Sequence, residues 1–105
     1  MVLLRICSKS RKKAEEIATF LLQKKLIMDV NLKADTVRLD WTNGKLNKSK
    51  IYVLTGKTKA LLFTKIDDLL RQKYGEQNLP EIYSLAIVHM DWEQADQLVR
   101  NTEKV

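Results

Sequence analysis

The sequence predicts an α+β domain whose elements follow the order β-α-β-β-α-β-α, and three observations lead to this class. Four segments have the alternating or continuous apolar character of strands, two segments between them have helical spacing, and Asn43-Gly44 is a strong hairpin signal. The first six elements match the ferredoxin-like, or split βαβ, arrangement, with an additional C-terminal helix. We expect residues 1–105 to form a single such domain, because this length leaves little room for a second.

The first two elements are a strand over residues 2–7 and a helix over residues 11–25. The strand segment is nearly all apolar, which is typical of a strand in the middle of a sheet. In the helix, apolar residues recur at i, i+3, i+4 and i+7, so one face is apolar. Ser8 and Ser10 are both suitable N-caps. The basic residues 11–13 that follow them oppose the helix dipole, and the sequence offers no reason for them.

The middle of the sequence predicts a long hairpin. Residues 28–32 and 37–41 both alternate between apolar and polar, but the apolar positions change from even to odd numbers. A continuous strand cannot make that change without turning its core face to solvent, so we expect a bulge near Ala34 and Asp35. A return strand over residues 51–55 follows the turn and is apolar on both faces.

The rest of the chain predicts a helix over residues 59–74, a strand over residues 82–88 and a short helix capped by Asp91. Gly75 is a natural residue to end the first of these helices. Three of the four strands are apolar on both faces, whereas two helices cover only one face of such a sheet. We therefore expect a second copy of the chain to cover the other face.

The charge and the cysteine content restrict the compartment and the partners. The net charge is +6, but the basic residues are spread along the chain, so a solvated surface is favoured over a polyanion partner. One cysteine, Cys7, cannot form an internal disulfide, which agrees with a reducing compartment. No apolar run approaches the roughly 18 residues that span a bilayer, and no basic segment precedes the first strand. We expect a cytoplasmic protein without a membrane partner.

Four short motifs resemble the CutA divalent-cation-tolerance family, and the resemblance extends over residues 3–102. They are Asp29-Val30-Asn31 in the place of the family's Cys-Val-Asn, Trp41-Thr42-Asn43-Gly44-Lys45 at its hairpin tip, Leu54-Thr55-Gly56-Lys57-Thr58 at its Lys-Thr motif, and Leu79-Pro80-Glu81-Ile82 at its Val-Pro-Glu-Ile. The resemblance implies a PII-like homotrimer whose sheets face one another around a three-fold axis. It also implies a role in divalent metal ion response or tolerance, or in small-ligand signalling, without catalysis.

Two departures from the family pattern argue against a strong metal site. The family's strand cysteine, a proposed copper ligand, is Asp29 here, and Gly75-Glu76-Gln77 replaces its His-Pro-Tyr. His89 and Asp91 are the candidates for a surface metal site. The sequence offers few of the ligands that bind copper tightly, because thiolates and imidazoles are nearly absent. We expect no cofactor. The one candidate for such a role is a divalent cation.

The motifs that carry catalysis are missing, so we expect a protein that is not an enzyme. The chain has one histidine, no Gly-x-Ser-x-Gly elbow and three isolated glycines, so neither a triad nor a phosphate loop is predicted. The resemblance instead places a ligand or ion between subunits. The candidate residues, which match the family motifs or lie beside them, are Asp29, Asn31, Lys57, Glu76 and Glu81.

Trp41 is the candidate interface residue. It alternates in phase with Val37 and Leu39, so its side chain belongs to the apolar side of its strand. It also lies at the far end of the hairpin, where one domain has little core to offer, so we expect it to anchor the hairpin against a neighbouring subunit. The alternative function is a basic ferredoxin-like module that binds nucleic acid or another polyanion. That alternative lacks the aromatic platform of RNA-binding sheets, because the two strands that should carry it contain only Tyr52.

Overall fold

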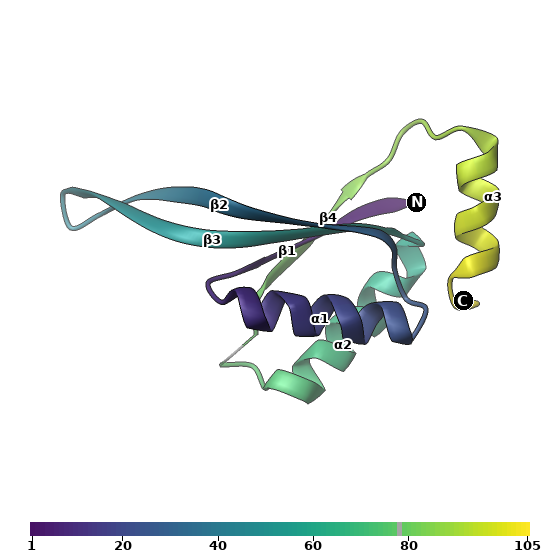
Figure 1. The fold of residues 1–105 in the computed structure, drawn as a ribbon, viewed down its shortest axis with the longest axis horizontal. Helices are drawn as coiled ribbons and strands as arrows, with labels where there is room; N and C mark the ends of the chain where they lie inside the picture. Colours follow the sequence, from purple (N-terminus) through teal and green to yellow (C-terminus); the bar gives the residue numbers. More distant parts are fainter. Residues whose placement is uncertain (78) are drawn as a thin grey trace.

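The structure is a computed structural model that describes residues 1–77 and 79–105. Its elements follow the predicted order (Figure 1). The elements are β1 (Val2–Ser8), α1 (Arg11–Gln23), β2 (Met28–Thr42), β3 (Lys45–Thr58), the 3-10 turn η1 (Ala60–Leu62), α2 (Phe63–Tyr74), β4 (Glu81–Ala86) and α3 (Trp92–Asn101). Ser10 caps α1 and accepts a hydrogen bond from the Lys13 amide at 3.2 Å, while Gly75 ends α2 with φ of 75°. Both assignments follow the ordinary chemistry of helix ends.

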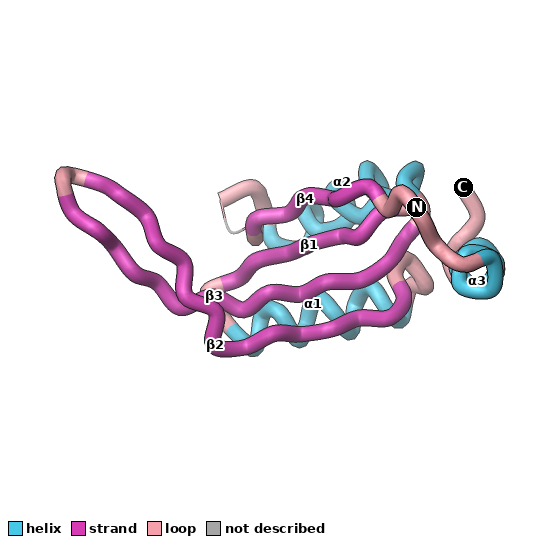
Figure 2. The backbone as a smooth tube through the Cα atoms, turned by 90° about the horizontal axis from the view of Figure 1, so that it is seen from above, coloured by secondary structure: helices cyan, strands magenta, loops and turns pink. Residues whose placement is uncertain are grey.

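The described strands form one antiparallel sheet in the order β2-β3-β1-β4. Helices α1 and α2 lie together on one face of it, and α3 stands beside the end of the sheet near the N-terminus (Figure 1). Figure 2 shows the β2–β3 hairpin leaving the rest of the sheet and projecting beyond it. This is the ferredoxin-like α+β arrangement with a C-terminal helix that the sequence predicts.

The main core lies between the sheet and the two helices. Alternate strand residues point to this face and meet the apolar stripes of α1 and α2. The buried members are Leu4, Ile6, Ile17, Leu21, Leu26, Ile27, Leu54, Leu62, Ile66 and Leu70. Gly56 is required for close packing here, because a Cβ at that position would collide with the side chain of Ile27.

The opposite face of the sheet is mixed rather than uniformly apolar. A second small cluster of buried residues, Cys7, Ile51 and Val53, lies on it. Farther along β1, the Arg5 guanidinium donates a hydrogen bond to the Tyr83 hydroxyl and lies 5.6 Å from the Tyr83 ring. The expectation that three strands are apolar on both faces therefore holds for the end of this face next to the hairpin and not for all of it.

The β2–β3 hairpin is longer than predicted. The pairing register shifts between Lys33 and Thr36, which confirms the bulge expected near Asp35, a residue with φ of 59°. The return strand was expected over residues 51–55, but β3 runs from Lys45 to Thr58. The last pair between β1 and β3 is Ser8 with Tyr52, and the hairpin continues beyond it. This part of the hairpin, residues 36–42 and 45–51, is named the hairpin extension here.

Three other boundaries differ from the predictions. Helix α1 ends at Gln23, not at residue 25, and the segment predicted as a helix over residues 59–74 begins with a 3-10 turn. Strand β4 ends at Ala86, although the apolar run continues to Val88. Val88 is 80% exposed, so this apolar side chain does not pack against the rest of the chain.

Candidate functional site

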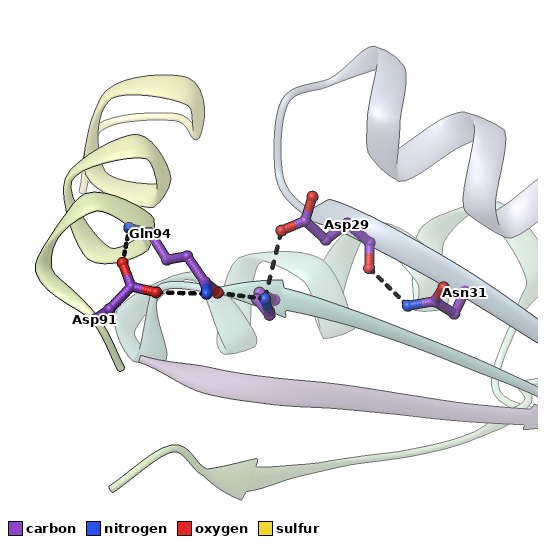
Figure 3. Close-up of polar contacts among 5 residues, drawn as sticks. Asp29, Asn31, Asp91 and Gln94 are labelled. Atoms are coloured by element: carbon purple, nitrogen blue, oxygen red, sulfur yellow. Dashed lines mark hydrogen bonds and ion pairs between the residues drawn. The ribbon is translucent and has the colours of Figure 1, made fainter. Parts of the chain in front are cut away.

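Lys57, near the end of β3, is the centre of a cluster of polar side chains beside α3. Figure 3 shows the other members, Asp29, Asn31, Asp91 and Gln94. Its ammonium lies 3.5 Å from the Asp29 carboxylate and donates a 2.8 Å hydrogen bond to the side-chain carbonyl of Gln94. The side-chain amide of Asn31 donates to the Asp29 backbone carbonyl at 3.3 Å. Three of the residues predicted from the family motifs, Asp29, Asn31 and Lys57, are therefore neighbours.

A local irregularity in β2 positions Asp29. The register with β3 shifts between Met28 and Asn31, and Asp29 has φ of 53°. Aspartate is among the residues that tolerate this left-handed conformation, because its short polar side chain can bond locally. At this position of an edge strand, the carboxylate is half exposed and lies within reach of Lys57.

Asp91 connects α3 to the same cluster. Its carboxylate caps the helix, accepting the Gln94 amide at 3.0 Å and the Gln94 side-chain amide at 2.6 Å. The backbone hydrogen bond from Gln94 is the largest cause that holds the pKa of the Asp91 carboxyl below its ordinary value. The side-chain hydrogen bond from Gln94 and the charge of Lys57 lower this pKa as well. Asp91 therefore stays ionised at neutral pH and orients Gln94 toward Lys57.

Glu81 and Glu76 lie away from this cluster. Glu81 begins β4 and pairs in register with Cys7, whereas Lys57 pairs with Leu3 at the other end of β1. Glu81 accepts a 2.6 Å hydrogen bond from Arg38 of β2. That bond raises the pKa of Arg38, and the charge of Glu81 adds to it against the opposing effect of burial.

Glu76 follows the end of α2, where its carboxylate lies 3.5 Å from Arg71. The five predicted ligand residues therefore form two groups at opposite ends of the sheet, with Asp29, Asn31 and Lys57 at one end and Glu76 and Glu81 at the other. Within a single chain these two groups do not converge on a common site.

The metal candidates do not form a binding cluster among residues 1–77 and 79–105. His89 is exposed in the segment before α3, and Asp91 is engaged as the helix cap. Within those residues, no three histidine, cysteine, aspartate or glutamate side chains gather as metal ligands. Cys7 is 4% exposed and packs as a small buried apolar residue.

Trp41 lies on the hairpin extension and is 72% exposed in the single chain. It pairs with Leu46, and alternation places Val37 and Leu39 on the same side of β2. These four residues, named the apolar row here, are each more than half exposed. The row has the composition of a surface that packs against another chain.

Two residues of these clusters were not predicted. Gln94 occupies the third helical position after the cap Asp91, so the Asp-x-x-Gln spacing of a capping box offered a local signal for it. Arg38 pairs with Glu81 across 43 residues of sequence. No local pattern connects residues so far apart, so this pair had no signal in the sequence.

The sheet order and the position of the helices define a ferredoxin-like α+β protein with a polar surface cluster at one end of its sheet. The family model for the CutA1 divalent ion tolerance protein matches residues 2–99, so the chain belongs to this family. The match confirms the resemblance drawn from the four motifs. A comparison with curated protein sequences gives no significant match.

Solved structures of the family share the fold. CutA1 from Pyrococcus horikoshii is 19% identical, with a TM-score of 0.84 over 99% of this chain and 100% of that chain. The divalent cation tolerance protein of Thermus thermophilus is 25% identical, and the periplasmic divalent cation tolerance protein CutA of Archaeoglobus fulgidus is 26% identical. Both have a TM-score of 0.82 and cover 98% of this chain and 100% of theirs.

Among the described helices, none combines the length and the apolar character that crossing a membrane requires.

Proposed function

We propose that this CutA1 family member is a cytoplasmic homotrimer that acts without catalysis and binds a small ligand or ion between its subunits. Its role would be divalent metal ion response or tolerance, or signalling through a small ligand, as in the PII-like superfamily. The coarse assignment follows from the family match over residues 2–99. The assembly and the mode of action are proposed from the features described below.

The hairpin extension is the observation that carries the proposed assembly. A two-stranded hairpin without further cover is marginally stable in water, yet this one continues well past the last residue of β1. Its exposed apolar row, Val37, Leu39, Trp41 and Leu46, finds no cover within the described chain. Packing against a neighbouring subunit would bury the row and stabilise the ribbon.

The division of the polar residues into two groups supports a ligand site between subunits. The Lys57 cluster and the Arg38–Glu81 pair lie at opposite ends of one sheet. In an assembly with a three-fold axis, one end of the sheet in one subunit can lie close to the opposite end of the sheet in the neighbouring subunit. A shared site of this kind requires the assembly, which connects ligand binding with oligomeric state.

The proposal predicts a trimer in solution. Multi-angle light scattering of the purified chain at micromolar concentration should return three times the 12.2 kDa mass of one chain. The expected mass should persist at high salt, because the proposed contacts are apolar. A monomer mass under these conditions would contradict the proposal and favour the alternative, a basic module that binds nucleic acid or another polyanion.

The absence of converging ligands predicts weak copper binding. Cys7 is buried, His89 is exposed, and the described residues contain no group of three potential ligands. Titration calorimetry with Cu(II), and with Cu(I) under reducing conditions, should show only weak, non-stoichiometric binding. Tight stoichiometric binding that survives both His89→Ala and Cys7→Ser would refute this prediction, because it would require ligands that the single chain does not bring together.

A further inference from the structure

A row of polar side chains crosses the face of the sheet that lies away from α1 and α2. Asn31 of β2 pairs with Thr55 of β3, and Arg5 of β1 pairs with Thr55 on one side. On its other side Arg5 pairs with Tyr83 of β4. The neighbours of these residues along each strand pack in the main core, so alternation directs the four side chains to the opposite face. We name these four residues the polar row; Figure 2 shows their strands lying side by side.

The polar row lies between the two groups of predicted ligand residues. Lys57 pairs with Leu3 on one side of Arg5 in β1, and Glu81 pairs with Cys7 on the other side. The same alternation places these side chains on the face that the proposed trimer covers. The polar row is therefore in the part of the interface where the proposed function expects a ligand.

The charge of Arg5 has no acidic partner within the described chain. The guanidinium donates a hydrogen bond to the Tyr83 hydroxyl and lies 5.6 Å from the centre of the Tyr83 ring. A hydroxyl carries no negative charge and occupies only part of the N–H donors of a guanidinium. None of the ion pairs among residues 1–77 and 79–105 includes Arg5. The positive charge is therefore solvated in the single chain and not compensated.

Covering this face with a second copy makes the uncompensated charge unfavourable. A charged side chain that loses its water needs a counter-charge, because desolvation without one costs far more than a hydrogen bond returns. The carboxylates at the two ends of the sheet are already engaged, Asp29 with Lys57 and Glu81 with Arg38. A second copy presents the same engaged carboxylates, so the counter-charge must come from a separate molecule.

We propose that the polar row binds one small organic monocarboxylate per subunit inside the trimer. This inference rests on the proposed function, because the site closes only when a neighbouring subunit covers the sheet. The planar fork of the Arg5 guanidinium matches the two oxygens of a carboxylate, and the Thr55 hydroxyl adds a donor beside it. The organic part lies against Leu3 and Leu85, a partly exposed apolar pair next to the row.

The number of available charges favours a carboxylate over a phosphate. Arg5 supplies one positive charge, whereas a phosphate monoester carries a charge of about −1.5 to −2 at pH 7. Lys57 cannot supply a second charge freely, because it is paired with Asp29. Lys33 lies on the edge strand β2, which β3 separates from Arg5. A phosphate bound at the row would therefore keep part of its own charge uncompensated.

The test uses three probes of similar size on the full chain. Benzoate carries the proposed features, benzamide lacks the charge, and phenyl phosphate carries too much of it. Titration calorimetry should give one benzoate per chain, with benzamide and phenyl phosphate each bound at least about tenfold more weakly. In the chain labelled with ¹⁵N, benzoate should move the amide signals of residues 3–7, 53–57 and 83–85. Light scattering on the same samples records the oligomeric state.

Two substitutions at Arg5 give effects that damage to the fold cannot imitate. Arg5→Gln keeps a side-chain amide that can donate to Tyr83, but it removes the charge. It should weaken benzoate binding at least about tenfold. Because it also removes an uncompensated charge from a covered face, it should raise the melting temperature of the ligand-free trimer by about 4 °C. Arg5→Lys keeps the charge without the planar fork, so it should weaken binding without raising the melting temperature.

The matched control is Arg11→Gln, which makes the same change on α1, on the other face of the sheet. Arg11 forms an exposed ion pair with Glu15, and such pairs contribute little to stability. The control should therefore leave both the affinity for benzoate and the melting temperature nearly unchanged. An equal loss of binding in this control would show a general effect of net charge and would overturn the proposal.

The remaining outcomes separate this inference from the proposed assembly. If a carboxylate of the neighbouring subunit compensates Arg5, then Arg5→Gln destabilises the trimer and benzoate does not bind, which overturns the proposal. Binding of benzamide or phenyl phosphate as tight as that of benzoate overturns it as well, as do shifted amides away from the polar row. A trimer that does not bind benzoate refutes this inference and leaves the assembly standing, whereas a monomer mass refutes both.

Discussion

Replacing Trp41 by alanine is expected to reduce the free energy of assembly by about 2–4 kcal/mol, the range of an interface anchor. The indole is 72% exposed in the single chain and lies in the apolar row of the hairpin extension. Its loss would therefore cost little within one chain and much in a trimer that buries it. Sedimentation or light scattering across a dilution series should show dissociation at concentrations where the parent chain remains trimeric.

Two further variants separate the anchor role from a general effect on the hairpin. Trp41→Phe keeps an aromatic side chain and should retain most of the assembly. Asp40→Asn alters the neighbouring residue, which alternation places on the other side of the ribbon, and should leave the trimer intact. If Trp41→Ala remains trimeric with an unchanged melting temperature, the tip of the hairpin is exposed in the assembly and a partner- or ligand-binding role for it becomes the better interpretation.

The order of the elements could be predicted because each has its own local signal. Apolar spacing marks the two long helices, Asn43-Gly44 marks the turn, and the change of parity between Leu32 and Val37 marks the bulge. The length of the hairpin could not be predicted in this way. Residues 45–50 contain three lysines and one apolar residue, and they form a strand because β2 supplies the pairing partner.

The candidate site was predictable only in part, for a related reason. Asp91 is a local helix cap, and its role follows from the residue type and its position. The contact between Lys57 and Asp29 depends on the register of β2 with β3 and on a second irregularity at Asp29, which the apolar pattern does not reveal. The contact between Arg38 and Glu81 depends on the topology of the sheet, which brings together two residues far apart in the sequence.

Leu98→Ala is the second substitution with a large expected effect. Within α3, all of which is described, Leu98 is the buried residue, with no exposed surface, while Val99 beside it is 51% exposed. Removing a fully buried leucine side chain typically costs about 2–5 kcal/mol, through lost burial and the cavity that remains. Helix α3 offers little other apolar contact to compensate, so the loss should fall on its attachment to the domain.

The other described hydrogen bonds that attach α3 to the domain are polar contacts at both of its ends, and at its start Gln94 accepts a hydrogen bond from Lys57 at 2.8 Å. After its end, the Glu103 amide donates to the Lys25 carbonyl at 2.8 Å, and the Lys59 ammonium donates to the Glu103 carbonyl at 2.8 Å. Such bonds contribute about 0.5–1.5 kcal/mol each when formed in water. They are not expected to hold the helix in place once Leu98 is truncated.

The measurement should therefore distinguish local release of α3 from global unfolding. In the Leu98→Ala variant, amide hydrogen exchange should accelerate across residues 92–101 more than in β1, and the signal of Lys57 should shift because its contact with Gln94 is lost. The control is Gln97→Ala, an exposed neighbour on the same helix, which should change stability by less than about 0.5 kcal/mol. Equal acceleration of exchange in β1 and α3 would show instead that α3 is an integral part of the cooperative core, and that the Lys57 cluster cannot be released without unfolding the domain.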